Sequence, residues 1–159
     1  QRQMCIRDSD YGPDENKTDD EVMLRLGQVY AAKEGKNPTE MSEDALTDVG
    51  RHVIDLWNEK AIVPDGWKVS PEDCIHAWMK FGEKVFKNFH GENIMVVSSN
   101  GVIRFAPYLT GDFNGFAGEH DIKVTTGGVC VFEREDDEEN WHCTEWNVKP
   151  KKYFESLPD

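Results

Sequence analysis

A short polar turn in the second half of the chain could bind an anion. The turn S-S-N-G, whose last residues are Ser99, Asn100 and Gly101, follows an apolar run at 94–97 and precedes apolar side chains at helical spacing over 102–109. A turn that joins a buried strand to a helix leaves unpaired backbone N–H groups and a positive helix end at the edge of the sheet. Serine hydroxyls can donate further hydrogen bonds there. The pattern therefore predicts an anion site at this turn.

The same turn has a simpler interpretation. Serine and asparagine are common at helix N-caps, where a side-chain oxygen accepts a hydrogen bond from a backbone N–H of the first turn. In that case Ser99 and Asn100 only begin a helix, and no ligand is involved. The turn by itself leaves both interpretations open.

Metal and thiol chemistry have little support in the sequence. The 4 cysteines form no C-x-x-C pair, and the 5 histidines form no H-x-x-x-H or H-E-x-x-H pair. Such pairs are the usual marks of zinc sites and redox motifs. We therefore expect no metal and no cofactor, and we expect reduced thiols in a cytoplasmic protein.

The charge of the chain disfavours nucleic acid as a partner. Asp and Glu number 31 and Lys and Arg 18, so the formal net charge is −13 at pH 7, which repels a polyanion. The acidic run at 133–139 is more typical of a solvated turn than of a cation site. The sequence shows no secretory signal and no apolar run that could span a membrane. Neither nucleic acid nor a membrane is therefore an expected partner.

Helix-start signals predict three long helices. They are expected at 19–33, 43–60 and 71–88. Thr18 and Glu21 form a capping box at the first, and Ser42 is the N-cap of the second. Ser70 begins the third, where a proline and two acidic residues suit the first turn. A shorter helical stretch is expected near 112–120.

Apolar runs of β type predict three strands. Residues 94–97 read as a strand that is buried on both faces of a mostly parallel sheet. Residues 127–133 and 141–148 predict an antiparallel pair on either side of the acidic turn. With the helices, these strands predict an α/β fold of three layers, α/β/α, whose mostly parallel sheet is flanked by helices and ends in the antiparallel pair.

The two ends of the chain differ from the middle. Gln1 to Ser9 has no clear period and no cap, and it joins abruptly to a strongly patterned segment. We interpret residues 1–9 as a foreign or artefactual leader. Residues 10–148 form the expected domain, and 149–159 form a polar tail.

One block of ten residues resembles a known family. Residues 95–104, M-V-V-S-S-N-G-V-I-R, resemble the second conserved block of the histidine phosphatase (phosphoglycerate-mutase-like) superfamily, usually V-V-S-H-G-G-V-I-R. Weaker similarities occur in the order of the family: Y-G-x-x-E at 11–15, T-G-x-V at 126–129 and E-W-N at 145–147. The resemblance covers about residues 10–148 and implies a phosphomonoester hydrolase or phosphomutase.

The resemblance also implies roles for individual residues. Glu15 matches the acid of the Y-G-x-x-E loop, which can give a proton to the leaving oxygen, although it could equally be an exposed acid with no role. Ser99 falls where the family has its second pocket histidine, and Asn100 falls at the glycine whose N–H approaches phosphate. Asn100 and Gly101 would bind phosphate together with Ser99. Arg104 is expected to point away from the pocket.

Two departures from the family limit this inference. The chain contains no R-H-G, the motif that carries the nucleophilic histidine, so we expect a partial domain that is inactive by itself. Ser99 replaces an imidazole that can carry positive charge, and loss of one such stabiliser costs about 10²–10³ in rate. The alternatives are a non-catalytic module that binds phosphate or a phosphorylated ligand, and an acidic interaction domain with no anion site.

Overall fold

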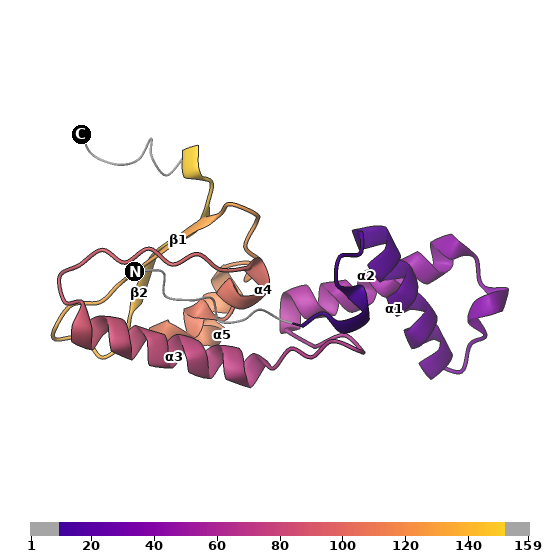
Figure 1. The fold of residues 1–159 in the computed structure, drawn as a ribbon, viewed down its shortest axis with the longest axis horizontal. Coiled ribbons are helices and arrows are strands. Elements are labelled where there is room, and N and C mark those ends of the chain that lie inside the picture. Colours follow the sequence, from indigo (N-terminus) through magenta and orange to yellow (C-terminus); the bar gives the residue numbers. More distant parts are fainter. Residues whose placement is uncertain (1–9, 152–159) are drawn as a thin grey trace. The chain divides into compact units, whose positions relative to one another are not determined.

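The protein contains both helices and strands, as expected for an α/β protein. Its structure, a computed structural model, describes residues 10–151 (Figure 1). These residues divide into two compact units, an N-terminal unit over 10–69 and a C-terminal unit over 70–151. The predicted leader at 1–9 and residues 152–159 of the predicted tail lie outside the described residues. No helix of the described part is both long and apolar enough to cross a membrane.

The N-terminal unit is built on two long helices. Its elements are η1 (Gly12–Asp14), α1 (Asp19–Lys33), η2 (Pro38–Glu40) and α2 (Glu43–Lys60). The predicted capping box is present, because the side chain of Thr18 accepts from the N–H of Glu21 while the Glu21 carboxylate accepts from the N–H of Thr18. The Ser42 hydroxyl accepts from the N–H of Ala45 at 3.3 Å. The boundaries predicted for both helices are confirmed.

Two glycines allow α1 and α2 to cross at backbone contact. A Cβ atom on Gly27 of α1 would lie 1.9 Å from the carbonyl oxygen of Leu46 in α2. A Cβ atom on Gly50 of α2 would lie 1.8 Å from the carbonyl oxygen of Met23 in α1. Both distances are far inside van der Waals contact. The crossing therefore requires glycine at both positions, and around it the apolar face of each helix is buried (Leu26, Ala31, Leu46, Val53, Trp57).

The C-terminal unit packs a long helix against short helical segments and a small sheet. Its elements are α3 (Pro71–Asn88), α4 (Asn100–Ile103), η3 (Ala106–Thr110), α5 (Phe113–Glu119), β1 (Val129–Glu133) and β2 (His142–Val148). The predicted start of α3 is confirmed, since the Ser70 hydroxyl accepts from the N–H of Asp73 at 3.1 Å. The Trp78 indole N–H donates to the Val102 carbonyl at 2.9 Å, which ties α4 to α3. The core is apolar (Cys74, Trp78, Val102, Phe105, Ala106, Leu109, Ile122, Val124).

The predicted antiparallel strand pair is confirmed. β1 pairs with β2, with Val129 opposite Val148 and Phe132 opposite Cys143, and the register shifts between these pairs. Residues 121–125 are tied to the end of β2. The Trp146 indole donates to the Asp121 carbonyl at 2.8 Å, and the Asn147 amide oxygen accepts from the N–H of Thr125 at 2.9 Å. The E-W-N segment at 145–147 thus has a structural role in this chain.

The single helix predicted over 102–109 is wrong in its extent. The helix begins earlier, at Asn100, and ends at Ile103, and a separate 3-10 segment, η3, follows. Pro107 explains the break, because proline has no N–H to donate and disfavours helical geometry at the residue before it. The turn at 98–101 is therefore followed by one turn of helix only.

The strand predicted at 94–97 is also wrong. No strand is assigned there, and the side chains of Ile94, Met95, Val96 and Val97 are 41%, 89%, 44% and 73% exposed. In the described part of the chain, the only sheet is the two-stranded antiparallel one. A strand exists only when a neighbouring strand supplies hydrogen bonds, and β1 and β2 pair with each other instead. Figure 1 draws the segment between α3 and α4 as an extended coil.

Candidate functional site

The polar turn at 98–101 lies where the extended segment becomes helical. Ser99 occupies the N-cap position of α4 with φ −77° and ψ 154°. Its carbonyl accepts from the N–H of Val102 at 3.1 Å and from the N–H of Ile103 at 2.9 Å. The backbone therefore bends at the residue that the anion-site prediction requires.

The hydroxyl of Ser99 does not cap this helix. Ser42 and Ser70 each accept a backbone N–H three residues ahead, but Ser99 makes no such bond. The hydroxyl oxygens of Ser98 and Ser99 are both buried and have no hydrogen-bond partner among residues 10–151. The simpler interpretation of Ser99, a capping side chain, is therefore not what the structure shows.

Two backbone amides at the turn are also unused. The N–H groups of Asn100 and Gly101 donate to no group within residues 10–151, since the first bonded amide of α4 is that of Val102. The first N–H groups of any helix have no intrahelical acceptor, so these two amides can donate to an anion or to water. Consecutive amides and hydroxyls that converge without an internal acceptor are the ingredients of an anion site. The turn thus carries donors on four successive residues, 98 to 101.

The helix that follows the turn is buried and tied to α3. Gly101 and Val102 are buried, and the bond from Trp78 to the Val102 carbonyl fixes α4. Arg104, four residues after Asn100, is only 2% exposed, so its guanidinium lies inside the C-terminal unit. The expectation that Arg104 points away from the turn stays a prediction.

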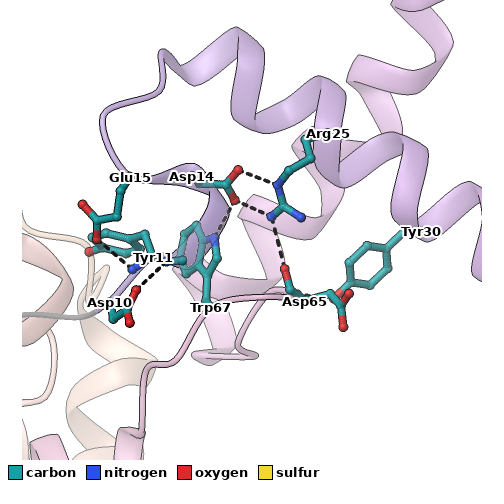
Figure 2. Close-up of polar contacts among 9 residues, drawn as sticks. Asp10, Tyr11, Asp14, Glu15, Arg25, Tyr30, Asp65 and Trp67 are labelled. Carbon is teal, nitrogen blue, oxygen red and sulfur yellow. Dashed lines mark hydrogen bonds and ion pairs between the residues drawn. The ribbon is translucent and has the colours of Figure 1, made fainter.

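Glu15 belongs to the other unit and has a local role there. Its carboxylate accepts from the N–H of Tyr11 at 2.9 Å, and the Asp10 carboxylate accepts from the N–H of Gly12 at 2.7 Å (Figure 2). These two bonds close the loop over 10–15. Glu15 is exposed, and its second carboxylate oxygen makes no bond within the described residues. The structure groups Ser99, Asn100 and Gly101, and the pairing of Glu15 with them stays a prediction.

Sequence reasoning missed a buried ion pair beside Glu15. The side chain of Asp14 is 2% exposed and holds the Arg25 guanidinium through both oxygens, while the Arg25 side chain is 24% exposed. The Trp67 indole donates to the same carboxylate at 2.7 Å, and Arg25 also donates to the Asp65 carbonyl at 3.1 Å (Figure 2). These bonds hold the 10–15 loop against α1 and the 61–69 segment. Nothing in the sequence distinguishes Asp14 from the acids around it.

The cysteines of the described part are buried or half-buried. No group of three or more His, Cys, Asp or Glu side chains within residues 10–151 is placed to hold a metal ion. Burial raises the pKa of the Cys74 and Cys130 thiols, and burial together with the nearby Cys130 raises the pKa of Cys143 to about 12. Thiols with raised pKa values are weak nucleophiles at neutral pH.

Comparison with known proteins neither supports nor contradicts a family assignment. No protein-family profile, no curated protein and no solved structure gives a significant match to this chain.

Proposed function

We propose that the C-terminal unit binds the phosphoryl group of a small phosphorylated compound, as part of a phosphomonoester hydrolase or phosphomutase that resembles the histidine phosphatases. The observation that supports the proposal best is the set of unused donors at 98–101: two buried hydroxyls and two backbone amides with no internal acceptor. A phosphate dianion offers several oxygen acceptors to such a set. The block at 95–104 that resembles the family contains these same residues.

In this proposal the turn binds phosphate and does not attack it. Ser99 donates from a neutral hydroxyl where the family has an imidazole, so it stabilises developing negative charge less well. The nucleophilic histidine would come from a segment outside this sequence, because the chain has no R-H-G. The proposed fold of the whole domain is the three-layer α/β/α arrangement of the family, with Glu15 as the proton donor to the leaving oxygen.

A second candidate function is a module that binds phosphate or a phosphorylated ligand without turnover. The observation that favours it is the identity of residue 99, since a serine keeps a hydrogen bond but lacks the charge that the family uses for catalysis. Both candidates share the phosphate contact. They differ in whether the complete protein turns a phosphomonoester over.

Phosphate titration of the full chain tests the shared step. We expect ³¹P NMR and thermal-shift measurements to detect binding of inorganic phosphate, with chloride at equal ionic strength as the reference. Ser99→Ala removes a hydrogen bond to a charged group, so the affinity should fall by about tenfold or more. Thr126→Ala, which removes an exposed hydroxyl of the same unit, should leave affinity unchanged.

The outcomes separate the alternatives. If phosphate does not bind, or if Ser99→Ala binds it as well as the parent chain does, the anion site is wrong and the chain is an acidic interaction domain. If phosphate binds, hydrolysis of p-nitrophenyl phosphate by the complete protein favours the enzyme, and its absence favours the binding module.

A further inference from the structure

The segment that joins α3 to α4 presents unused backbone to the surroundings. From Asn93 to Ser98, no backbone N–H or C=O makes a hydrogen bond to any other group of residues 10–151. The segment is extended, and four of its side chains are apolar and exposed (Ile94, Met95, Val96, Val97). Extended backbone of this kind is a template for another strand.

Exposure along the segment alternates, and all four apolar side chains are exposed. Met95 and Val97 are 89% and 73% exposed, whereas Ile94 and Val96 are 41% and 44% exposed. Alternate side chains of a strand point to opposite faces, so Met95 and Val97 would lie on the more exposed face and Ile94 and Val96 on the less exposed one. The segment is extended, and no strand within residues 10–151 pairs with it.

The beginning of this segment lies beside a group of carboxylates. The Nε2 atom of His90 lies 2.5 Å from Oδ1 of Asp136. The acidic run at 133–139 therefore lies beside His90, which is two residues before Glu92. Glu92 adds a further acid at the same end. The other end, at Ser98 and Ser99, is neutral. A neighbouring strand would therefore meet acidic side chains at the beginning of the segment.

We propose that residues 93–98 are a docking strand for an extended segment of a partner protein. The partner segment has alternating apolar side chains, and it carries Lys or Arg where it lies beside Glu92 and the acidic turn. Its backbone supplies the missing hydrogen bonds, and its charge complements the acidic end. This proposal does not use the phosphate site, and at this segment it replaces the proposed three-layer fold, in which a strand of the same domain would lie here.

The charge of the chain argues for a basic partner over a second copy of the chain. Two copies would each bring a formal net charge of −13 to the contact, and this repulsion opposes association. A lysine- or arginine-bearing strand gains attraction from the same charge. The attraction is exposed to solvent, so added salt should weaken it.

Fluorescence anisotropy with defined peptides tests the proposal on the full chain. The probe is a labelled peptide of alternating valine and threonine with a pair of lysines at one end, made in both orientations. One control replaces the lysines with glutamates, and another carries N-methyl groups on alternate backbone amides, which removes donors. We expect at least one lysine peptide to bind. Each control peptide should bind with an affinity at least about tenfold lower.

Variants locate the contact. Met95→Pro removes a backbone donor and should weaken binding by about tenfold, whereas Met95→Thr keeps the donor and a strand-compatible side chain and should bind within about threefold of the parent chain. Ile62→Thr changes an exposed apolar residue of the other unit and should have no effect. Circular dichroism checks that each variant keeps the helix content of the parent.

Several results would overturn the proposal. They are equal binding of the lysine and glutamate peptides, equal binding of the N-methylated peptide, and an effect of Met95→Thr as large as that of Met95→Pro. Sedimentation that shows a dimer which the lysine peptide cannot dissociate would assign the segment to a second copy of the chain instead.

Discussion

The crossing of α1 and α2 predicts that alanine is worse than glycine at residue 27, although alanine is the better helix former. Helix propensity alone favours Gly27→Ala by about 1 kcal/mol. The added Cβ, however, would lie 1.9 Å from the carbonyl oxygen of Leu46, where contact requires roughly 3.5 Å. A backbone oxygen cannot rotate away, so the helices must separate. Overpacking of this kind costs about 1–3 kcal/mol or more, and we expect a net loss of about 1–2 kcal/mol.

Urea unfolding followed by far-ultraviolet circular dichroism measures this loss. The matched control is Gly118→Ala in α5, where no atom lies within 4 Å of the added Cβ. There, helix propensity acts alone and should stabilise the protein by about 0.5–1 kcal/mol. The two substitutions should therefore shift the midpoint in opposite directions. A midpoint for Gly27→Ala that rises like that of Gly118→Ala would refute the close crossing.

Two further predictions concern buried polar groups. Asp14→Asn removes the charge that binds Arg25, and because Arg25 is a quarter exposed we expect a loss of about 2–3 kcal/mol in urea unfolding rather than the full value for a buried pair. An unchanged midpoint would show that the pair contributes nothing. Burial raises the pKa of Cys143 from 9.0 to about 12, so between these pH values the folded state keeps the thiol proton and the unfolded state loses it. The free energy of unfolding is therefore unaffected by this thiol below pH 9 and decreases as the pH rises from 9 toward 12. Iodoacetamide at pH 8 should label Cys143 slowly until urea unfolds the chain, and equal labelling rates before and after unfolding would contradict the burial.

The helices could be predicted closely because their signals are local. Thr18, Ser42 and Ser70 cap helices with their own side chains, using backbone N–H groups three residues ahead. No distant residue is needed for these bonds. The antiparallel pair of β1 and β2 was also predictable, because its two strands are near in sequence and joined by a polar turn. The hydrogen bonds that define each of these elements join residues that are near in sequence.

The segment at 94–97 shows where the same reasoning fails. Its residues have a strong β preference. Such a preference shows that the segment can pair with a neighbouring strand, but it does not show that the fold supplies one. Within the described residues no strand pairs with it, so its apolar side chains are exposed. Helix caps carry no such dependence, which is why they were predicted correctly and this strand was not. The same dependence explains why the segment is suited to accept a strand from another protein.

The candidate site lies between these two cases. The composition of 98–101 predicted a turn with free donors, and the turn is present, but Ser99 would have been expected to use its hydroxyl as a cap. It does not: the N–H of Val102, three residues ahead, donates to the Ser99 carbonyl instead, at 3.1 Å. The Trp78 indole of α3 bonds to the Val102 carbonyl, and α3 lies outside the local pattern. An anion that accepts from all four residues would remove the cost of leaving them unpaired, which is why phosphate should raise the stability of this unit as well as bind to it.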